Sequence, residues 1–175
     1  MTTIEAIVAV DKKYGIAKNG NIPWKSKTDM TFFKNKTINN IVVMGTKTFL
    51  SLPKGAPLKD RLNIVLTRDI NKFSKQENVL VLDEILLLDL LKEPKKYVNQ
   101  SEYKYLNFDY TIFIIGGLQI YERFCRHCST IWLTKIKADY ECDLILKNEI
   151  LDCFTPFYIS NADYLQLFNY FITIK

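Results

Sequence analysis

The sequence predicts an α/β fold with a mostly parallel central sheet of about eight strands, helices on both faces and an antiparallel C-terminal strand. Short, continuously apolar runs, such as residues 41–44 and 111–115, have the length and composition of buried strands. Segments with helical spacing separate most of these runs, as in βαβ units. The last apolar runs have no helix between them, so we expect antiparallel pairing at that end of the sheet.

The expected elements follow one another along the chain. Ser26 or Thr28 is suited to cap the first helix, because a side-chain oxygen there accepts an unpaired backbone N–H. Asp83 is suited to cap a very apolar helix that Pro94 closes, whereas residues 95–107 have no clear period and predict a surface loop or a helix extension. The expected strands are residues 4–10, 41–44, 62–66, 78–81, 111–115, 130–136 and 168–174, and the expected helices are residues 26–36, 46–50, 83–92 and 117–128.

Length and composition predict one domain over residues 1–175. The 175 residues include 48% hydrophobic and 25% charged residues, which excludes a disordered chain. No apolar run approaches the roughly 20 residues of a membrane span, and the N-terminus lacks the basic-then-apolar order of a signal peptide. We therefore expect a cytoplasmic domain without membrane association.

The charge balance indicates the chemistry of the partners. The chain has 24 Lys and Arg against 19 Asp and Glu, a net charge of +5. A modest positive excess suits a ligand that carries phosphates or carboxylates. The lysines are scattered, so we expect no nucleic-acid binding.

The cysteines leave two interpretations open. Cys125 and Cys128 have the C-x-x-C spacing, and His127, the only histidine, lies between them. A metal site is conceivable, but no second close pair accompanies the motif. We expect buried or half-buried thiols on a core face, and no metal.

The loop after the first strand is a candidate lid. Residues 15–24 form a long segment with two glycines that ends in Pro23 and Trp24. Loops of this kind exclude water from a site by closing over it. The alternative is an ordinary surface crossover.

Asp29 is the candidate catalytic carboxylate. Phe32 and Phe33 follow three and four residues later, so on a helix they share its face. A carboxylate among apolar groups needs a partner or keeps its proton to a higher pH. The alternative is an aspartate that only stabilises the first turn of a helix.

Three strand ends are suited to phosphate. Residues 45–48 place a glycine, a lysine and two hydroxyls between a strand and a helix, and Gly116 and Gly117 follow the strongest strand. Thr67 and Arg68 add a hydroxyl and a guanidinium after a third strand. With Asp29, these ends describe a dinucleotide-dependent enzyme that acts on a heterocycle.

In this order, the segments resemble dihydrofolate reductase. The resemblance runs from Ile4 to about Asp143 and implies NADPH-dependent reduction of 7,8-dihydrofolate to tetrahydrofolate, which supplies one-carbon metabolism and thymidylate synthesis. It also implies the three-layer fold of that family, a monomer, inhibition by antifolates, and no room for a fused thymidylate synthase. The segments that carry it are residues 7–10, 15–24, 29–33, 43–49, 57–68, 115–121 and 133–136.

The resemblance assigns catalytic roles to Asp29 and Thr134, with Ile22 and Trp24 of the loop closing over the reacting rings. Asp29 would accept two hydrogen bonds from the pterin and favour protonation at N5, and Arg61 would bind the glutamate α-carboxylate. The implied substrate positions are Ile7, Val8, Asp29, Met30, Phe33, Ser51, Leu52, Leu58, Arg61, Ile115, Tyr121 and Thr134.

For the cofactor, the resemblance implies that Lys47 and Thr48 hold the pyrophosphate and that Arg68 holds the 2′-phosphate. It also implies a cis peptide bond between Gly116 and Gly117. The implied cofactor positions are Ala9, Ile16, Gly20, Gly45, Thr46, Lys47, Thr48, Leu66, Thr67, Arg68, Gly116, Gly117, Leu118, Gln119, Ile120 and Tyr121.

Some positions depart from the family pattern, and one alternative function is open. Asp60 stands where the family usually has glycine, Leu118 replaces a small or polar residue, and Cys142 opens a segment that is hard to align. The alternative is a related NADPH-dependent reductase of riboflavin or pterin biosynthesis. Asp29 and Arg61 argue against it, because the riboflavin substrate has neither a pterin nor a glutamate tail.

Overall fold

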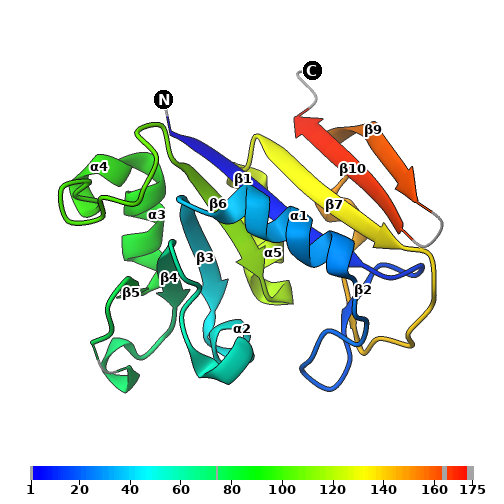
Figure 1. The fold of residues 1–175 in the computed structure, drawn as a ribbon, viewed down its shortest axis with the longest axis horizontal. Coiled ribbons are helices and arrows are strands. Elements are labelled where there is room, and N and C mark those ends of the chain that lie inside the picture. The colour runs from blue at the N-terminus through cyan, green and yellow to red at the C-terminus, as the bar shows by residue number, and fades with distance from the viewer. Residues whose placement is uncertain (1, 74, 163–164, 173–175) are drawn as a thin grey trace.

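The computed structural model describes residues 2–73, 75–162 and 165–172. Its main sheet consists of β1 (Thr3–Val10), β3 (Ile41–Gly45), β4 (Leu62–Leu66), β5 (Val79–Leu82), β6 (Thr111–Gly116), β7 (Thr130–Ile136), β9 (Phe154–Ala162) and β10 (Leu165–Ile172). The strand order is β5-β4-β3-β6-β1-β7-β10-β9 (Figure 1). Neighbours from β5 to β7 pair in parallel, and β10 is antiparallel to both β7 and β9. The predicted fold class is confirmed.

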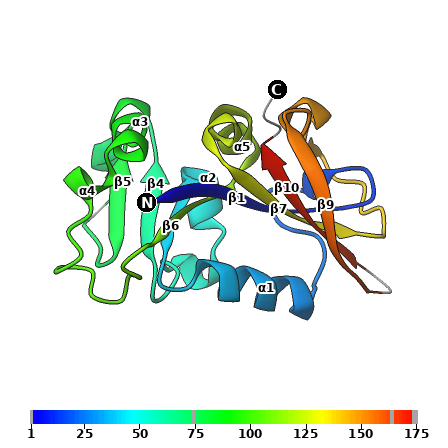
Figure 2. The ribbon, with the colours of Figure 1, turned by 90° about the horizontal axis from the view of Figure 1, so that it is seen from above.

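Helices cover both faces of this sheet. They are α1 (Lys27–Thr37), α2 (Thr46–Leu50), α3 (Glu84–Lys92), α4 (Pro94–Tyr97) and α5 (Leu118–Phe124). Figure 2 shows α1 on one side of the sheet and α3 and α5 on the other. Because side chains alternate along a strand, Ile41 and Val43 pack towards α3 and α5, whereas Val42 and Met44 pack towards α1 and α2.

The helix ends follow local signals. The Ser26 hydroxyl accepts the backbone N–H of Asp29 at 3.1 Å, and the Asp83 carboxylate accepts that of Leu86 at 2.8 Å. The helix expected to reach residue 128 ends at Phe124 and continues as a 3₁₀ turn, Cys125–His127. Cys125 and Cys128 are buried, as predicted.

Three strands of the structure were not expected from the sequence. β2 (Gly15–Ala17) and β8 (Leu144–Ile145) pair as a small antiparallel sheet, and both are too short to show a period. β9 contains Pro156, which argues against a central strand but is tolerated at the edge that β9 occupies. The last expected strand begins earlier, at Leu165, and residues 173–174 of that expectation lie outside the described residues.

Part of the segment without a clear period is helical. α4 covers Pro94–Tyr97, and the rest of the segment up to residue 107 consists of turns and loops. None of the helices in the described ranges has the length and apolarity that a bilayer crossing requires. Within the same ranges, no three His, Cys, Asp or Glu side chains cluster as metal ligands would.

Candidate active site

The candidate site lies where the carboxyl ends of the parallel strands meet. β1, β3, β4, β5, β6 and β7 all end on this edge, which is where ligands bind in open α/β sheets. The residues singled out from the sequence lie on the ends of β1, β3, β4, β6 and β7 and on the loops and helices that follow β1, β3, β4 and β6. The helix α1 contributes the carboxylate from one face.

Asp29 lies in the first turn of α1 and is half-buried against the sheet. Burial raises the pKa of Asp29, and a hydrogen bond from the Thr134 side chain lowers it, with a net upward shift. Thr134 is itself buried on β7, where it pairs with Ala9 of β1, so the hydroxyl stands on a rigid strand. The site therefore holds a carboxyl group that keeps its proton to a higher pH than an exposed aspartate does.

Apolar side chains line the face of the sheet towards α1, the helix that carries Asp29. The half-buried members are Phe33, Leu52, Leu58 and Ile115. They pack against a cluster that includes Ile7 of β1. Ile22 and Met30 are 65% and 66% exposed, respectively. Exposed apolar side chains together with a half-buried carboxylate are suited to a flat ring that is apolar on its faces and polar at its edge.

Two predicted substrate positions, Val8 and Tyr121, are turned away from this face. Val8 packs in the cluster with α3 and α5, so its side chain lies on the other side of the sheet from Asp29. Tyr121 is buried, and its hydroxyl donates to the carbonyl oxygen of Ile7 at 2.9 Å. Burial raises the pKa of Tyr121 well above its ordinary value, and the nearby Cys125 and Asp29 add to the effect. Tyr121 therefore stays protonated and anchors the β1 carbonyl.

Arg61 is buried at the start of β4 and held by fixed partners. Its Nε donates to the carbonyl of Lys59 at 2.9 Å, and its Nη1 donates to the Thr37 hydroxyl at 3.0 Å. Thr37 in turn donates to the carbonyl of Phe33 on α1 at 2.8 Å. Asp60, which precedes Arg61, has φ 55°, so an aspartate adopts the left-handed conformation that the family's glycine favours.

Two strand ends approach each other closely at the edge. The peptide bond between Gly116 and Gly117 is cis. A Cβ on Gly117 would lie 3.3 Å from the Thr48 hydroxyl oxygen, and one on Gly45 would lie 3.2 Å from Ile120 Cγ1. Side chains at these positions would crowd the gap between the strand ends. The glycines therefore keep the backbone accessible to a phosphate group.

Two cationic side chains at this edge, Lys47 and Arg68, have no polar partner among the described residues. Both side chains are exposed. Thr67 is half-buried, and its hydroxyl accepts the backbone N–H of Asp69 at 3.2 Å. Free cations beside accessible amides fit a dinucleotide with phosphate groups.

The remaining predicted positions divide between the edge and the core. Ile16 and Ile120 are buried in the cluster with α3 and α5, and Leu118 packs against that cluster, which accounts for a large apolar residue at the start of α5. Ser51 ends α2 by donating its hydroxyl to the carbonyl of Thr48 at 2.8 Å. The positions that stay half-buried or exposed at the edge are Ala9, Gly20, Thr46, Leu66 and Gln119.

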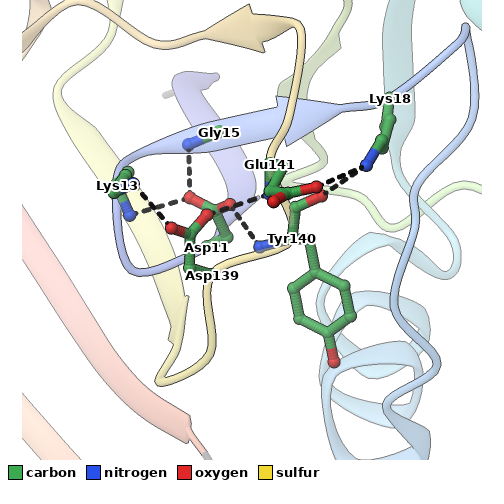
Figure 3. Close-up of polar contacts among 7 residues, drawn as sticks. All are labelled: Asp11, Lys13, Gly15, Lys18, Asp139, Tyr140 and Glu141. Atoms are coloured by element: carbon green, nitrogen blue, oxygen red, sulfur yellow. Dashed lines mark hydrogen bonds and ion pairs between the residues drawn. The ribbon is translucent and has the colours of Figure 1, made fainter.

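The lid loop, residues 15–24, rests on the segment after β7. Trp24 is only 6% exposed, and its ring centroid lies 5.5 Å from that of Tyr140. At the base of the loop the buried Asp11 accepts backbone N–H groups from both sides (Figure 3). The sequence pattern predicts no role for Asp11 or Tyr140. The only local signal for Asp11 is its position directly after a buried strand.

The topology and the site together define an α/β domain that presents one half-buried carboxyl group beside an open apolar wall and a phosphate-compatible strand edge. The family model for dihydrofolate reductase matches residues 3–155. The chain belongs to the dihydrofolate reductase family.

Individual relatives agree with this assignment. The chain is 34% identical over 155 residues to a dihydrofolate reductase of Heliothis virescens, covering 83% of this chain and 79% of that protein. It is 32% identical over 168 residues to a bifunctional dihydrofolate reductase-thymidylate synthase of Glycine max, covering 90% of this chain but only 30% of that protein. A solved dihydrofolate reductase of Enterococcus faecalis, complexed with NADP(H) and an inhibitor named RAB-propyl, superposes with a TM-score of 0.77 at 23% identity, covering 98% of this chain and 97% of that one.

Proposed function

We propose that this chain catalyses the NADPH-dependent reduction of 7,8-dihydrofolate to 5,6,7,8-tetrahydrofolate. The observation that carries the proposal is Asp29, a half-buried carboxyl group with a raised pKa, supported by Thr134 and followed on α1 by the exposed Met30. Family membership supports the same reaction. Tetrahydrofolate then serves one-carbon metabolism and thymidylate synthesis.

The residues around Asp29 bind and orient the substrate. The Asp29 carboxylate accepts two N–H groups from the edge of the pterin, a charge-assisted pair that fixes the orientation of the ring. Ile22, Met30 and Phe33 cover its apolar faces. Arg61, already fixed by Thr37, points its remaining donors at the glutamate α-carboxylate of the substrate. Antifolates that mimic the pterin edge use the same carboxylate.

The raised pKa of Asp29 supports a role in proton transfer. Burial disfavours the charged form, so the group accepts and releases a proton closer to neutral pH than an exposed aspartate does. Through a water molecule, that proton reaches N5 of the pterin. Thr134 limits the shift by stabilising the carboxylate, so that both protonation states remain accessible. NADPH, when bound, supplies the hydride that reduces C6.

The strand edge holds the dinucleotide. Lys47, Thr48 and the backbone amides that follow Gly117 bind the pyrophosphate, where the glycines keep the backbone accessible. Arg68 and Thr67 bind the 2′-phosphate and select NADPH over NADH. Ala9 and Gly20 border the nicotinamide beneath the lid loop.

A spectrophotometric assay of NADPH oxidation tests the proposal. The purified chain is measured with NADPH alone, with added dihydrofolate, and finally with an antifolate. We expect oxidation that requires dihydrofolate and that the antifolate stops. Oxidation that does not depend on dihydrofolate would overturn the proposal, and so would an absence of oxidation in a folded sample that binds NADPH.

A further inference from the structure

The lid loop and the segment after β7 are joined by several backbone contacts. β2 of the lid loop pairs with β8, and the backbone N–H of Asp143 donates to the carbonyl of Ala17 at 3.0 Å. The Asp143 carboxylate accepts the backbone N–H of Asn19 at 2.7 Å. We call residues 137–146 the floor segment, because the lid loop lies on them. The position of the lid loop therefore depends on where this segment is held.

Asp11 is the buried link between the two segments. It is fully buried, and one carboxylate oxygen accepts the backbone N–H groups of Lys13 and Gly15, each at 2.8 Å. The other oxygen accepts the backbone N–H of Tyr140 at 3.1 Å, and the Cys142 thiol adds a side-chain hydrogen bond. Burial alone would raise the pKa of Asp11, but these donors together hold it below its ordinary value. The ionised carboxylate is thus the form that fits (Figure 3).

Two ion pairs near Asp11 lie at the surface. Lys13 pairs with Asp139 at 2.7 Å, and Lys18 pairs with Glu141 at 3.3 Å. Exposed ion pairs of this kind contribute little to stability. Asp11 differs from them because its side chain is fully buried and accepts three backbone N–H groups at once.

Side chains of the floor segment pack directly against the lid loop. A Cβ on Gly15 would lie 2.3 Å from Cys142 Cβ, so the lid backbone rests on Cys142 without a gap. Trp24 packs in a small cluster with Tyr140, Cys142 and Ile136. A shift of residues 140–142 would therefore be transmitted to Trp24 at the far end of the lid loop.

We propose that Asp11 is a positioning residue for the reductase reaction. Its carboxylate fixes the turn that begins the lid loop and, at the same time, the floor segment under that loop. It thereby sets where Ile22 and Trp24 lie over the reacting rings. This inference rests on the proposed function, because it assigns Asp11 a part in the same reaction without contact to the substrate.

The test compares Asp11→Asn with Asp139→Asn. An asparagine at position 11 replaces one acceptor oxygen with an N–H₂ group and removes the charge, so at least one of the three backbone donors loses its partner. Asp139→Asn makes the same chemical change at an exposed position of the floor segment: it weakens the pair with Lys13 and keeps an oxygen that can accept the backbone N–H of Glu141, at 2.9 Å from the Asp139 carboxylate. It is therefore the matched control.

Two readouts separate positioning from simple destabilisation. For Asp11→Asn we expect kcat to fall about tenfold, while the KM for dihydrofolate rises less than twofold, because Asp29 and Arg61 lie outside both segments. In a Trp132→Phe background Trp24 is the only tryptophan of the chain. Relative to this background alone, we expect acrylamide to quench the fluorescence of Trp24 more strongly when Asp11→Asn is added. When Asp139→Asn is added, the quenching should be unchanged. If the background variant does not fold, amide hydrogen exchange of Tyr140 replaces the quenching.

The outcomes are distinguishable. A folded Asp11→Asn variant with unchanged kcat and unchanged quenching would overturn the proposal, and so would equal losses in the Asp139→Asn control. If the unmodified chain shows no dihydrofolate-dependent oxidation, the proposed function fails instead. Quenching and exchange, which need no turnover, would then still show whether Asp11 holds the lid loop.

Discussion

The two faces of the central sheet differ in how completely the protein covers them. Towards α3 and α5, Ile41, Val43, Ile112 and Ile114 are fully buried in one continuous core. Towards α1, the residues that alternate with them begin in a smaller buried cluster. Nearer the carboxyl edge, this second face ends in side chains that are half-buried or exposed.

The difference separates stability from function. The covered face contains closely packed apolar side chains, whereas the face towards α1 also carries Asp29 and Thr134. Met30 on α1 and Ile22 of the lid loop remain exposed although each could stabilise the fold by packing. The uncovered apolar surface and the half-buried acid both cost stability, as expected of a face that serves function and not packing.

The sharpest test of this comparison is Asp29→Asn. The substitution keeps the shape of the side chain but removes the proton that the site handles, so we expect kcat to fall about 10²- to 10⁴-fold at neutral pH. The residual rate should increase as the pH falls, because the reaction then depends on substrate that is protonated in solution. NADPH binding, measured by fluorescence titration, should be unchanged. Wild-type turnover in Asp29→Asn would remove this residue from the mechanism.

The comparison can also be broken by truncating one apolar side chain on each face. Leu90→Ala removes a fully buried side chain of α3, and we expect a loss of about 2–5 kcal/mol in the free energy of unfolding. Met30→Ala removes an exposed side chain, and we expect a change within about 0.5 kcal/mol. The KM for dihydrofolate should instead rise several-fold in Met30→Ala. Urea unfolding measures the loss of stability in both variants, and steady-state kinetics measures the KM for dihydrofolate. Equal losses of stability in Leu90→Ala and Met30→Ala would contradict the difference between the two faces.

A third test concerns the cations. Arg68→Ala should weaken NADPH binding by about 10- to 100-fold, as expected for a charged hydrogen-bond donor, and NADH binding by much less. Arg126, an exposed arginine on the 3₁₀ turn after α5, provides the control, since Arg126→Ala should alter neither affinity. Dissociation constants for NADPH and NADH, measured on both variants, check this difference in affinity. Equal weakening of NADPH and NADH would place the 2′-phosphate elsewhere.

Much of this contrast is visible in the sequence. Continuous apolar runs predict strands that are buried on both faces, and Phe32 and Phe33 after Asp29 predict a carboxylate held against apolar groups. Both expectations depend on neighbours within a few residues, and the structure agrees with them: Asp29 is half-buried, and the parallel strands are in place.

What escaped prediction depends on contacts between distant parts of the chain. The hydrogen bond from Tyr140 to Asp11 joins residues 129 positions apart, and no local pattern announces it. Val8 shows a different limit. Its side chain packs towards α3 and α5, so the substrate position that the resemblance implies for Val8 stays a prediction that would involve its backbone.

The smallest expected effect is on stability, and its sign distinguishes the two buried aspartates. Burial raises the pKa of Asp29 in the folded state, so the stability associated with its proton is complete below the unfolded pKa of about 3.9 and is lost as the pH rises through the folded value. Replacing it with asparagine should therefore stabilise the fold at neutral pH and make little difference in acid.

Asp11 should behave in the opposite way. Its folded pKa is lowered, against the effect of burial, by the backbone N–H groups of Tyr140, Gly15 and Lys13, so its contribution is present above pH ~3.9 and is lost as the pH falls through the folded value. Asp11→Asn should then destabilise the fold at neutral pH and approach the wild type in acid. Urea midpoints for both variants between about pH 3 and pH 7 test the pair. If both substitutions destabilise the fold at neutral pH, the Asp29 carboxylate carries no cost, and the contrast between a packed face and a ligand-binding face loses its energetic basis.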